Sequence, residues 1–240
     1  MRLSILTVEL SDFESKVMKD LLEQNKKPMI QRVKLPKNIK PFRYYPHHIK
    51  EIFLILFPKN VGINDSSKIA IVFGPRGDEP IFNNVLGVTN YFIEVFNLKK
   101  FYELSDSEKE MFFLENIKNS LINIVNNNSK DEEIIKQITS TADRVIESKF
   151  SLEIEVKKLS KISIDKKYKI SVYRVLNKEV GEGWKYIKTN RKTKQIIEEN
   201  WLENIPNYLN RTDFYKRSEI YVNEYVIKDY LGSIRYKMII

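Results

Sequence analysis

The sequence has no cysteine, two histidines and seven glycines among its 240 residues. Without cysteine there can be no disulfide, no thiolate catalysis and no cysteine-bound zinc or iron–sulfur centre. The few glycines also leave no cradle for a nucleotide. Residues 74–80, GPRGDEP, lack the Gly-Lys-Ser/Thr of a phosphate loop and the spacing of a dinucleotide fingerprint, so we expect a turn there. We expect no cofactor and no catalytic metal site.

The only histidines, His47 and His48, are neighbours in the chain. Adjacent side chains point about 100° apart on a helix and to opposite faces of a strand, so they are poorly placed to hold one metal ion. Pro46 just before them favours the start of a helix. We expect a surface pair, and metal ligation or base catalysis is the alternative.

Long apolar runs are also missing. A helix that spans a bilayer needs about 20 apolar residues in a row, and the longest candidate here, residues 52–58, is far shorter. The first 16 residues are interrupted by Ser4, Thr7 and Glu9, so they lack the apolar core of a signal peptide. We expect a soluble cytoplasmic protein without a membrane partner.

The strongest structural pattern runs from residue 90 to residue 125. Residues 91–96 are aromatic and β-branched on both faces, which is typical of a central strand. Ser105 and Glu108 then fit a capping box at the start of a helix. The apolar residues of this helix recur every three or four positions, at Leu114, Ile117, Leu121 and Ile124.

A second amphipathic helix follows an asparagine-rich turn. Ser129 and Glu132 repeat the capping-box spacing, and apolar residues continue to Ile146. Two such helices joined by a short turn predict a helical hairpin. We expect a single domain over residues 1–240, with an alternative division into two lobes that meet near 126–129.

The remaining elements are predicted from apolar periodicity. In the first half we expect a strand at 3–10, a helix to about residue 24 and a strand at 68–73; 47–57 favours a helix over a strand, and 81–88 is ambiguous. In the second half, alternation predicts strands at 150–156 and 168–172, a hairpin of 184–188 with 195–198, and a closing hairpin of 220–227 with 233–240. We expect a short helix at 201–209. The fold class is therefore α+β: a mostly antiparallel sheet with the helical hairpin and the N-terminal helix packed on it.

Basic residues gather in two segments, 26–43 and 185–194, within a net charge of +9. The first segment has no acid between Glu23 and Glu51 and ends in aromatic residues. Cations can neutralise phosphates and rings can stack on bases, so both segments could bind nucleic acid. The alternative is a solvated lysine-rich face that guards strand edges. The candidate nucleic-acid-binding residues are Lys34, Lys37, Lys40, Arg43, Tyr44, Tyr45, Lys188, Arg191 and Lys192.

The triplet Glu155-Val156-Lys157 lies on a predicted strand and resembles the E-x-K of metal-dependent PD-(D/E)xK nucleases. The resemblance covers the triplet alone. It implies a Mg²⁺-binding carboxylate and a phosphate-contacting lysine. The upstream acid of that pattern would be Asp143, which falls in a predicted helix instead of a strand. The polar face of a half-exposed strand also produces such pairs.

The sequence thus favours binding over chemistry. The leading hypothesis is a non-enzymatic binding module, such as an immunity- or accessory-type bacterial protein, whose partner is another protein. The alternative is a nucleic-acid-binding protein that uses segments 26–43 and 185–194. A metal-dependent nuclease ranks third. Oligomeric state and the identity of the partner do not follow from the sequence.

Overall fold

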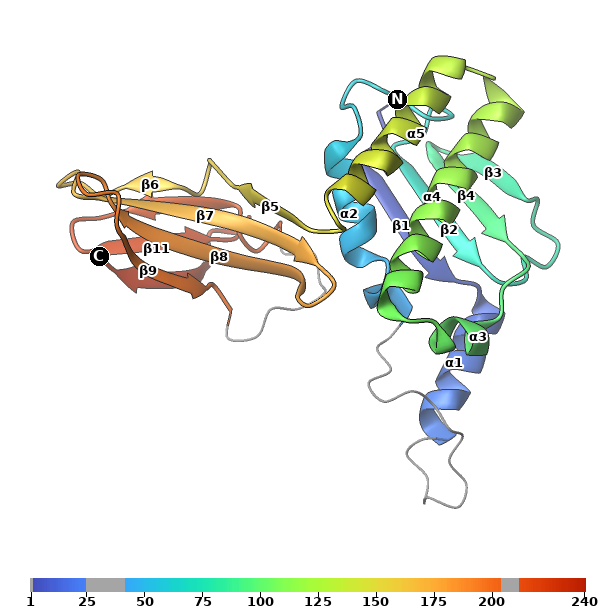
Figure 1. Cartoon of the computed structure of the whole chain (residues 1–240), viewed down its shortest axis with the longest axis horizontal. Coiled ribbons are helices and arrows are strands. Elements are labelled where there is room, and N and C mark those ends of the chain that lie inside the picture. The colour runs from blue at the N-terminus through green and yellow to red at the C-terminus, as the bar shows by residue number, and fades with distance from the viewer. Residues whose placement is uncertain (1, 25–41, 204–211) are drawn as a thin grey trace. The chain divides into compact units, whose positions relative to one another are not determined.

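A computed structural model of the chain describes residues 2–24, 42–203 and 212–240. The chain forms two compact units, Met1–Phe150 and Ser151–Ile240, and each is described by itself (Figure 1). The division falls after Phe150 and not near 126–129. That turn lies inside the first unit, because the helix after it folds back and packs on the helix before it.

The sheet of the first unit has the strand order β1-β2-β4-β3. Strands β1 (Ile5–Leu10), β2 (Lys68–Phe73) and β4 (Val88–Ile93) are parallel, and β3 (Phe82–Val85) runs antiparallel beside β4. The strands predicted at 3–10 and 68–73 are confirmed. The ambiguous stretch 81–88 contains β3 and its tight turn into β4, where Leu86 and Gly87 both have positive φ, as a two-residue hairpin turn requires.

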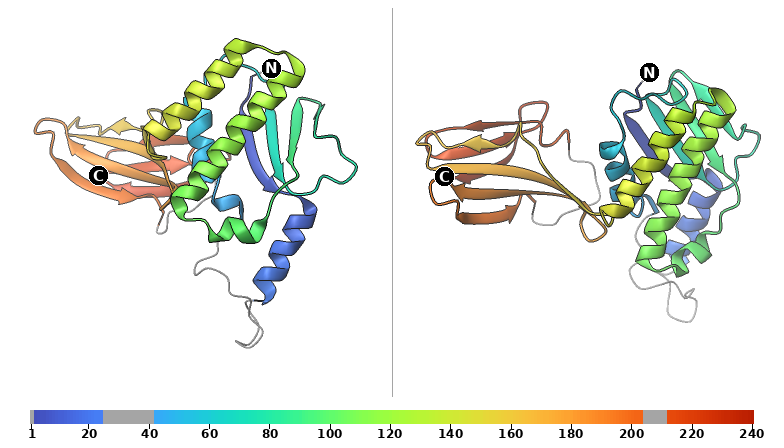
Figure 2. Two further views of the ribbon diagram at one scale, coloured as in Figure 1. Left: turned by 45° about the vertical axis from the view of Figure 1, so that its right-hand side comes forward. Right: turned by 45° about the horizontal axis from the view of Figure 1, so that its top comes forward.

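The helices of this unit are α1 (Asp12–Gln24), α2 (His47–Leu56), α3 (Leu98–Glu103), α4 (Asp106–Asn128) and α5 (Glu132–Glu147), with a short 3₁₀ turn, η2 (Phe42–Tyr44). Helices α4 and α5 form the predicted hairpin and lie side by side over one face of the sheet (Figures 1 and 2). The buried core beneath them includes Phe53, Ile69, Ile71, Leu114, Ile117, Leu121, Ile138 and Ala142.

The two predicted capping boxes have different outcomes. At α4 the box is present: Ser105 Oγ accepts from the Glu108 N–H, and the Glu108 carboxylate accepts from the Ser105 N–H at 2.7 Å. At α5 the prediction is wrong. The N-cap is Asp131, whose Oδ1 accepts from two backbone N–H groups, while Ser129 closes the preceding helix. A carboxylate two positions nearer the helix outcompetes the serine.

The second unit is built from strands. A five-stranded antiparallel sheet contains β5 (Leu152–Glu155), β7 (Tyr168–Asn177), β8 (Gly181–Asn190) and β9 (Ile196–Trp201), with β6 (Lys161–Ile162) beside β7. A three-stranded antiparallel sheet contains β10 (Arg217–Ile220), β11 (Glu224–Lys228) and β12 (Ile234–Ile239). Side chains of both sheets share one core, which includes Ile170, Val172, Trp184, Tyr186, Tyr225 and Ile227.

The predictions for this half are largely confirmed. The β8–β9 and β11–β12 hairpins occur where alternation placed them. The predicted strand 220–227 is two strands, because the chain turns at 221–223 between β10 and β11. The start of the helix predicted at 201–209 is wrong, because Trp201 is the last residue of β9. Residues 204–211 lie outside the described residues. The α+β class is confirmed, although the helices cover a mainly parallel sheet and the antiparallel strands form the other unit.

Candidate nucleic-acid interface

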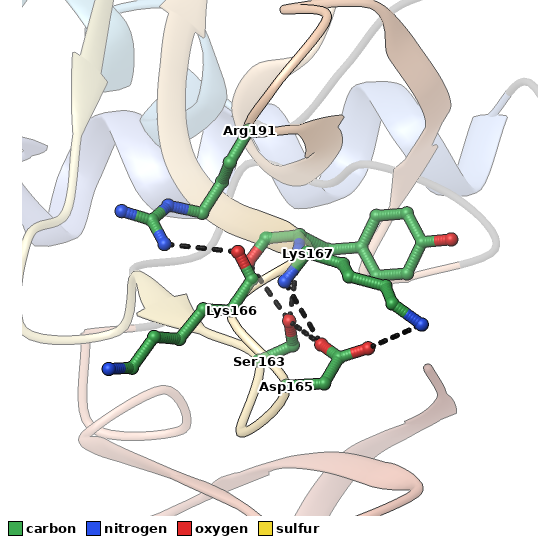
Figure 3. Close-up of polar contacts among 6 residues, drawn as sticks. Ser163, Asp165, Lys166, Lys167 and Arg191 are labelled. Carbon is green, nitrogen blue, oxygen red and sulfur yellow. Dashed lines mark hydrogen bonds and ion pairs between the residues drawn. The ribbon is translucent and has the colours of Figure 1, made fainter.

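Two turns of the second unit meet at one end of its larger sheet. The first turn, residues 163–167, joins β6 to β7, and the second, residues 191–194, joins β8 to β9. The Arg191 backbone N–H donates to the Lys167 carbonyl at 2.8 Å. The Arg191 guanidinium donates to the Lys166 carbonyl at 3.0 Å (Figure 3). One arginine therefore holds the two turns together by its main chain and its side chain.

The β6–β7 turn has a fixed internal structure. Ser163 is buried, and its hydroxyl donates to Asp165 Oδ1 at 2.6 Å and accepts from the Tyr168 N–H at 2.9 Å (Figure 3). Asp165 also accepts from the Lys167 N–H at 3.0 Å. These hydrogen bonds hold the pKa of the Asp165 carboxyl below its ordinary value, and the bond from Ser163 has the largest effect. The charged aspartate therefore stabilises the turn through its hydrogen bonds with Ser163 and Lys167.

The β8–β9 turn is braced in the same manner. Asn190 Oδ1 accepts from the N–H groups of Lys192 and Thr193 at 2.9 and 3.1 Å. The Lys194 N–H closes the turn on the Asn190 carbonyl at 2.8 Å, and Lys194 adopts a left-handed φ of 62°. The main chain is satisfied locally, so the long basic side chains are left to point into solvent.

Together these turns expose a group of cations that we name the basic end: Lys166, Lys167, Arg191, Lys192 and Lys194. Within the two turns, Asp165 is the acid that opposes them, and it lies 3.4 Å from Lys167 in a pair that is largely exposed. Such a pair contributes little to stability, and the other cations keep their charge uncompensated. The excess of positive charge favours an anionic partner.

An aromatic ring lies next to the basic end. Lys188 Nζ sits 4.7 Å from the centroid of the Tyr168 ring, within the range of a cation–π contact. Tyr168 and Lys188 are both half-buried and stand on the neighbouring strands β7 and β8. This contact pre-orients the lysine beside the exposed cations.

The candidate residues from the first basic segment belong to the other unit. Lys34, Lys37 and Lys40 lie outside the described residues. The Arg43 guanidinium lies 5.3 Å from the Tyr44 ring centroid. The Tyr45 ring packs edge-on against Phe101 and Tyr102, with centroids 5.4 and 6.0 Å apart. Phe42, one of the aromatic residues that end the first basic segment, is buried in a phenylalanine cluster with Phe73, Phe96, Phe101 and Phe113.

Of the nine candidates, the structure brings Lys188, Arg191 and Lys192 together. The sequence missed Lys166 and Lys167, which precede Arg191 by about 25 positions and approach it only through the β7–β8 pairing. A usable signal was present: Asp165-Lys166-Lys167 is a short turn sequence that leads into an alternating strand. Whether residues 26–43 and 185–194 share one surface stays a prediction.

The histidine prediction is wrong. His47 and His48 are buried, not a surface pair. His48 Nε2 lies 2.9 Å from Glu110 Oε1 on α4, and both side chains are nearly inaccessible. The first turn of α2 packs against α4, and a helix start that is buried in this manner turns both residues inward. Tertiary packing outweighs the preference of histidine for the surface.

The nuclease pattern gains no support from the geometry. Glu155 is engaged by Lys169 at 2.9 Å, and this hydrogen bond is the largest cause of the lowered pKa of its carboxyl. Asp143 is an exposed residue of α5 in the first unit. Among the residues that the structure describes, no three histidine, aspartate or glutamate side chains are grouped to hold a metal ion.

Comparison with protein-family models, with curated proteins and with solved structures gives no match to this chain. None of the helices in the described ranges is long and apolar enough to cross a bilayer. Functional inference therefore depends on the geometry of the molecule itself.

Proposed function

We propose that this protein is a non-enzymatic nucleic-acid-binding protein and that the basic end of its second unit contacts the phosphate backbone. The observation that carries the proposal is the meeting of the two turns, which gathers Lys166, Lys167, Arg191, Lys192 and Lys194 around the bond from Arg191 to Lys166. The basic residues of the turns 163–167 and 191–194, which are separate in the sequence, thereby form one charged surface. Rigid turns present these cations without a large loss of backbone entropy on binding.

The chemistry of the basic end suits phosphates more than bases. Its side chains are long, exposed cations, and phosphate contacts of this kind carry affinity without reading sequence. Tyr168 is half-buried and its ring is already covered by Lys188, so we expect it to orient this lysine and not to stack on a base. Binding should therefore be tolerant of sequence and steeply dependent on salt.

Filter binding of the full chain to single-stranded RNA and DNA at low and at physiological salt tests the proposal. A triple variant, Arg191→Ala, Lys192→Ala and Lys194→Ala, should lose most of the retention at low salt. The matched control replaces three other exposed lysines of the same unit, Lys178, Lys216 and Lys237, by alanine. It lowers the net charge equally and should bind nearly as the wild type does.

The outcome separates the two leading hypotheses. Equal loss in both triple variants would show that net charge, not the basic end, attracts the nucleic acid. No retention of the wild type at low salt, where electrostatic binding is strongest, would refute the proposal. A protein partner, which the sequence favours, would then be the better hypothesis.

A further inference from the structure

One face of the sheet in the first unit has no helix over it. Helices α4 and α5 lie on the opposite face (Figure 2), where Leu6, Ile69, Ile71 and Phe73 are buried. Parallel sheets normally have both faces covered. No element of this unit that the structure describes packs on the second face, which leaves Ile5 about half exposed at 49%.

The residues of this open face form three rows across β1, β2 and β4. The pairing places Ile5, Lys68 and Val88 in the row at the amino end. Thr7, Ala70 and Asn90 form the middle row, and Glu9, Val72 and Phe92 form the row at the carboxyl end. The outer rows are thus apolar except for one charge each, of opposite sign.

Polar groups on the open face lack partners. Glu9 and Lys68 make no ion pair within the described ranges of the chain, and they are too far apart along the strands to reach each other. Thr7 Oγ1 is buried in the middle row and has no hydrogen-bond partner among residues 2–24, 42–203 and 212–240. An unsatisfied buried hydroxyl costs free energy and is uncommon in native proteins.

We propose that the open face binds a second copy of this chain, face to face, about a two-fold axis that runs along the middle row. This operation lays the amino-end row of one copy over the carboxyl-end row of the other. Lys68 then faces Val72 of the second copy, one strand away from Glu9 of that copy, so its long side chain can reach the glutamate, and each middle-row group meets its own counterpart.

The shape of the face agrees with this arrangement. A hollow of about 530 Å³ runs along this face, and it is lined by residues 75–77 of the loop after β2 and by sheet residues of all three rows: Glu9, Lys68, Ala70, Val72, Asn90 and Phe92. The half-exposed Ile5 stands at the amino end of the face, outside the lining of this hollow, and can enter the hollow of the other copy. A face of four strands measures only about 15 by 17 Å at ordinary spacings. It is smaller than a standard interface, so we expect a dimer that dissociates on dilution.

Charge reversal on the full chain tests the proposal. Sedimentation velocity over a wide range of concentrations should show a monomer–dimer equilibrium for the wild type. Glu9→Lys alone and Lys68→Glu alone each place like charges within reach of one another twice in the dimer. Each should weaken association by about a hundredfold or more. The double reversal restores opposite charges and should recover most of the affinity.

Two controls carry the same changes of charge on α3. Glu103→Lys and Lys99→Glu lie at exposed positions away from the open face and should dimerise as the wild type does. Thermal melts by circular dichroism exclude unfolding as the cause of any loss. A wild type that stays monomeric at every concentration would overturn the proposal. So would single reversals that associate as tightly as the wild type, or a double reversal that recovers nothing.

Discussion

His48 Nε2 lies 2.9 Å from Glu110 Oε1 and joins helix α2 to helix α4 across 62 positions of sequence. Among the described residues His48 Nδ1 has no hydrogen-bond partner, so the hydrogen bond of this side chain in that part of the chain is the one through Nε2. The glutamate is 8% exposed. A buried carboxylate that loses its partner still pays the free-energy cost of desolvation but no longer gains the hydrogen bond. Removal of the histidine alone should therefore cost more stability than removal of both side chains.

We therefore predict that His48→Ala destabilises the first unit by about 3 kcal/mol. The double variant His48→Leu with Glu110→Leu should lose clearly less, because it removes both polar groups and keeps the volume filled. Urea unfolding followed by far-ultraviolet circular dichroism, which reports the helices, measures both. Equal losses in the single and the double variant would contradict the pairing.

The helical hairpin gives a second prediction. Ile117 and Leu121 are 1% and 0% exposed on α4, so Ile117→Ala and Leu121→Ala should each cost about 2–5 kcal/mol. Met111 lies on the same helix at 37% exposure, and Met111→Ala should cost much less. Chemical denaturation of the three variants is sufficient. A loss near zero at Ile117 or Leu121 would mean that the buried stripe has been misassigned.

A third prediction concerns Trp201, whose ring covers Gly183. A Cβ atom at position 183 would lie 2.6 Å from Trp201 Cζ3, closer than real contacts allow. Gly183→Ala should therefore cost about 1–3 kcal/mol through displacement of the ring. In a Trp201→Ala background the same substitution should be nearly neutral. If the cost is unchanged there, the strain comes from another neighbour.

The fourth prediction is a dependence on pH. The hydrogen bond from Lys169 lowers the pKa of Glu155 below its ordinary value of 4.5 in the folded state. A carboxyl whose pKa is lower in the folded than in the unfolded state contributes stability that is fully present above the unfolded pKa. This stability is lost as the pH falls through the folded pKa. The second unit should thus lose stability between about pH 5 and pH 3, and Glu155→Gln should make the loss shallower.

Tryptophan fluorescence can follow this unit alone, because both tryptophans of the chain, Trp184 and Trp201, lie in it. Urea midpoints at neutral and acidic pH give the dependence. The control is Glu179→Gln, at an exposed carboxylate of the β7–β8 turn, which should keep the wild-type slope. Parallel curves for wild type and Glu155→Gln would show that the ion pair does not contribute.

Local patterns in the sequence predicted local structure well. Ser105 and Glu108 are three residues apart, and the capping box that they predicted is present. The alternation of apolar and polar residues is also a local pattern, and it predicted the β8–β9 hairpin. Where two local signals compete, as Ser129 and Asp131 do, the pattern alone did not decide which residue caps the helix.

Relationships across long stretches of chain could not be read in this manner. The parallel pairing of β1 with β2 joins residues about 63 positions apart, and no local spacing reports it. The burial of His48 depends on Glu110, and the basic end depends on Lys166 meeting Arg191. Half of the candidate site was therefore visible as a charged segment, and its other half became visible only with the strand pairing.

The most direct test of the account is the salt dependence of RNA binding by the basic end. Fluorescence anisotropy with a labelled single strand gives the slope of the logarithm of affinity against the logarithm of salt. If the basic end engages four phosphates, the slope is about −3, and it should become shallower by about 0.7 for each contacting cation removed. Lys192→Ala and Lys194→Ala should show this stepwise change while Lys216→Ala and Lys237→Ala do not. Identical slopes in all of these variants would contradict the account.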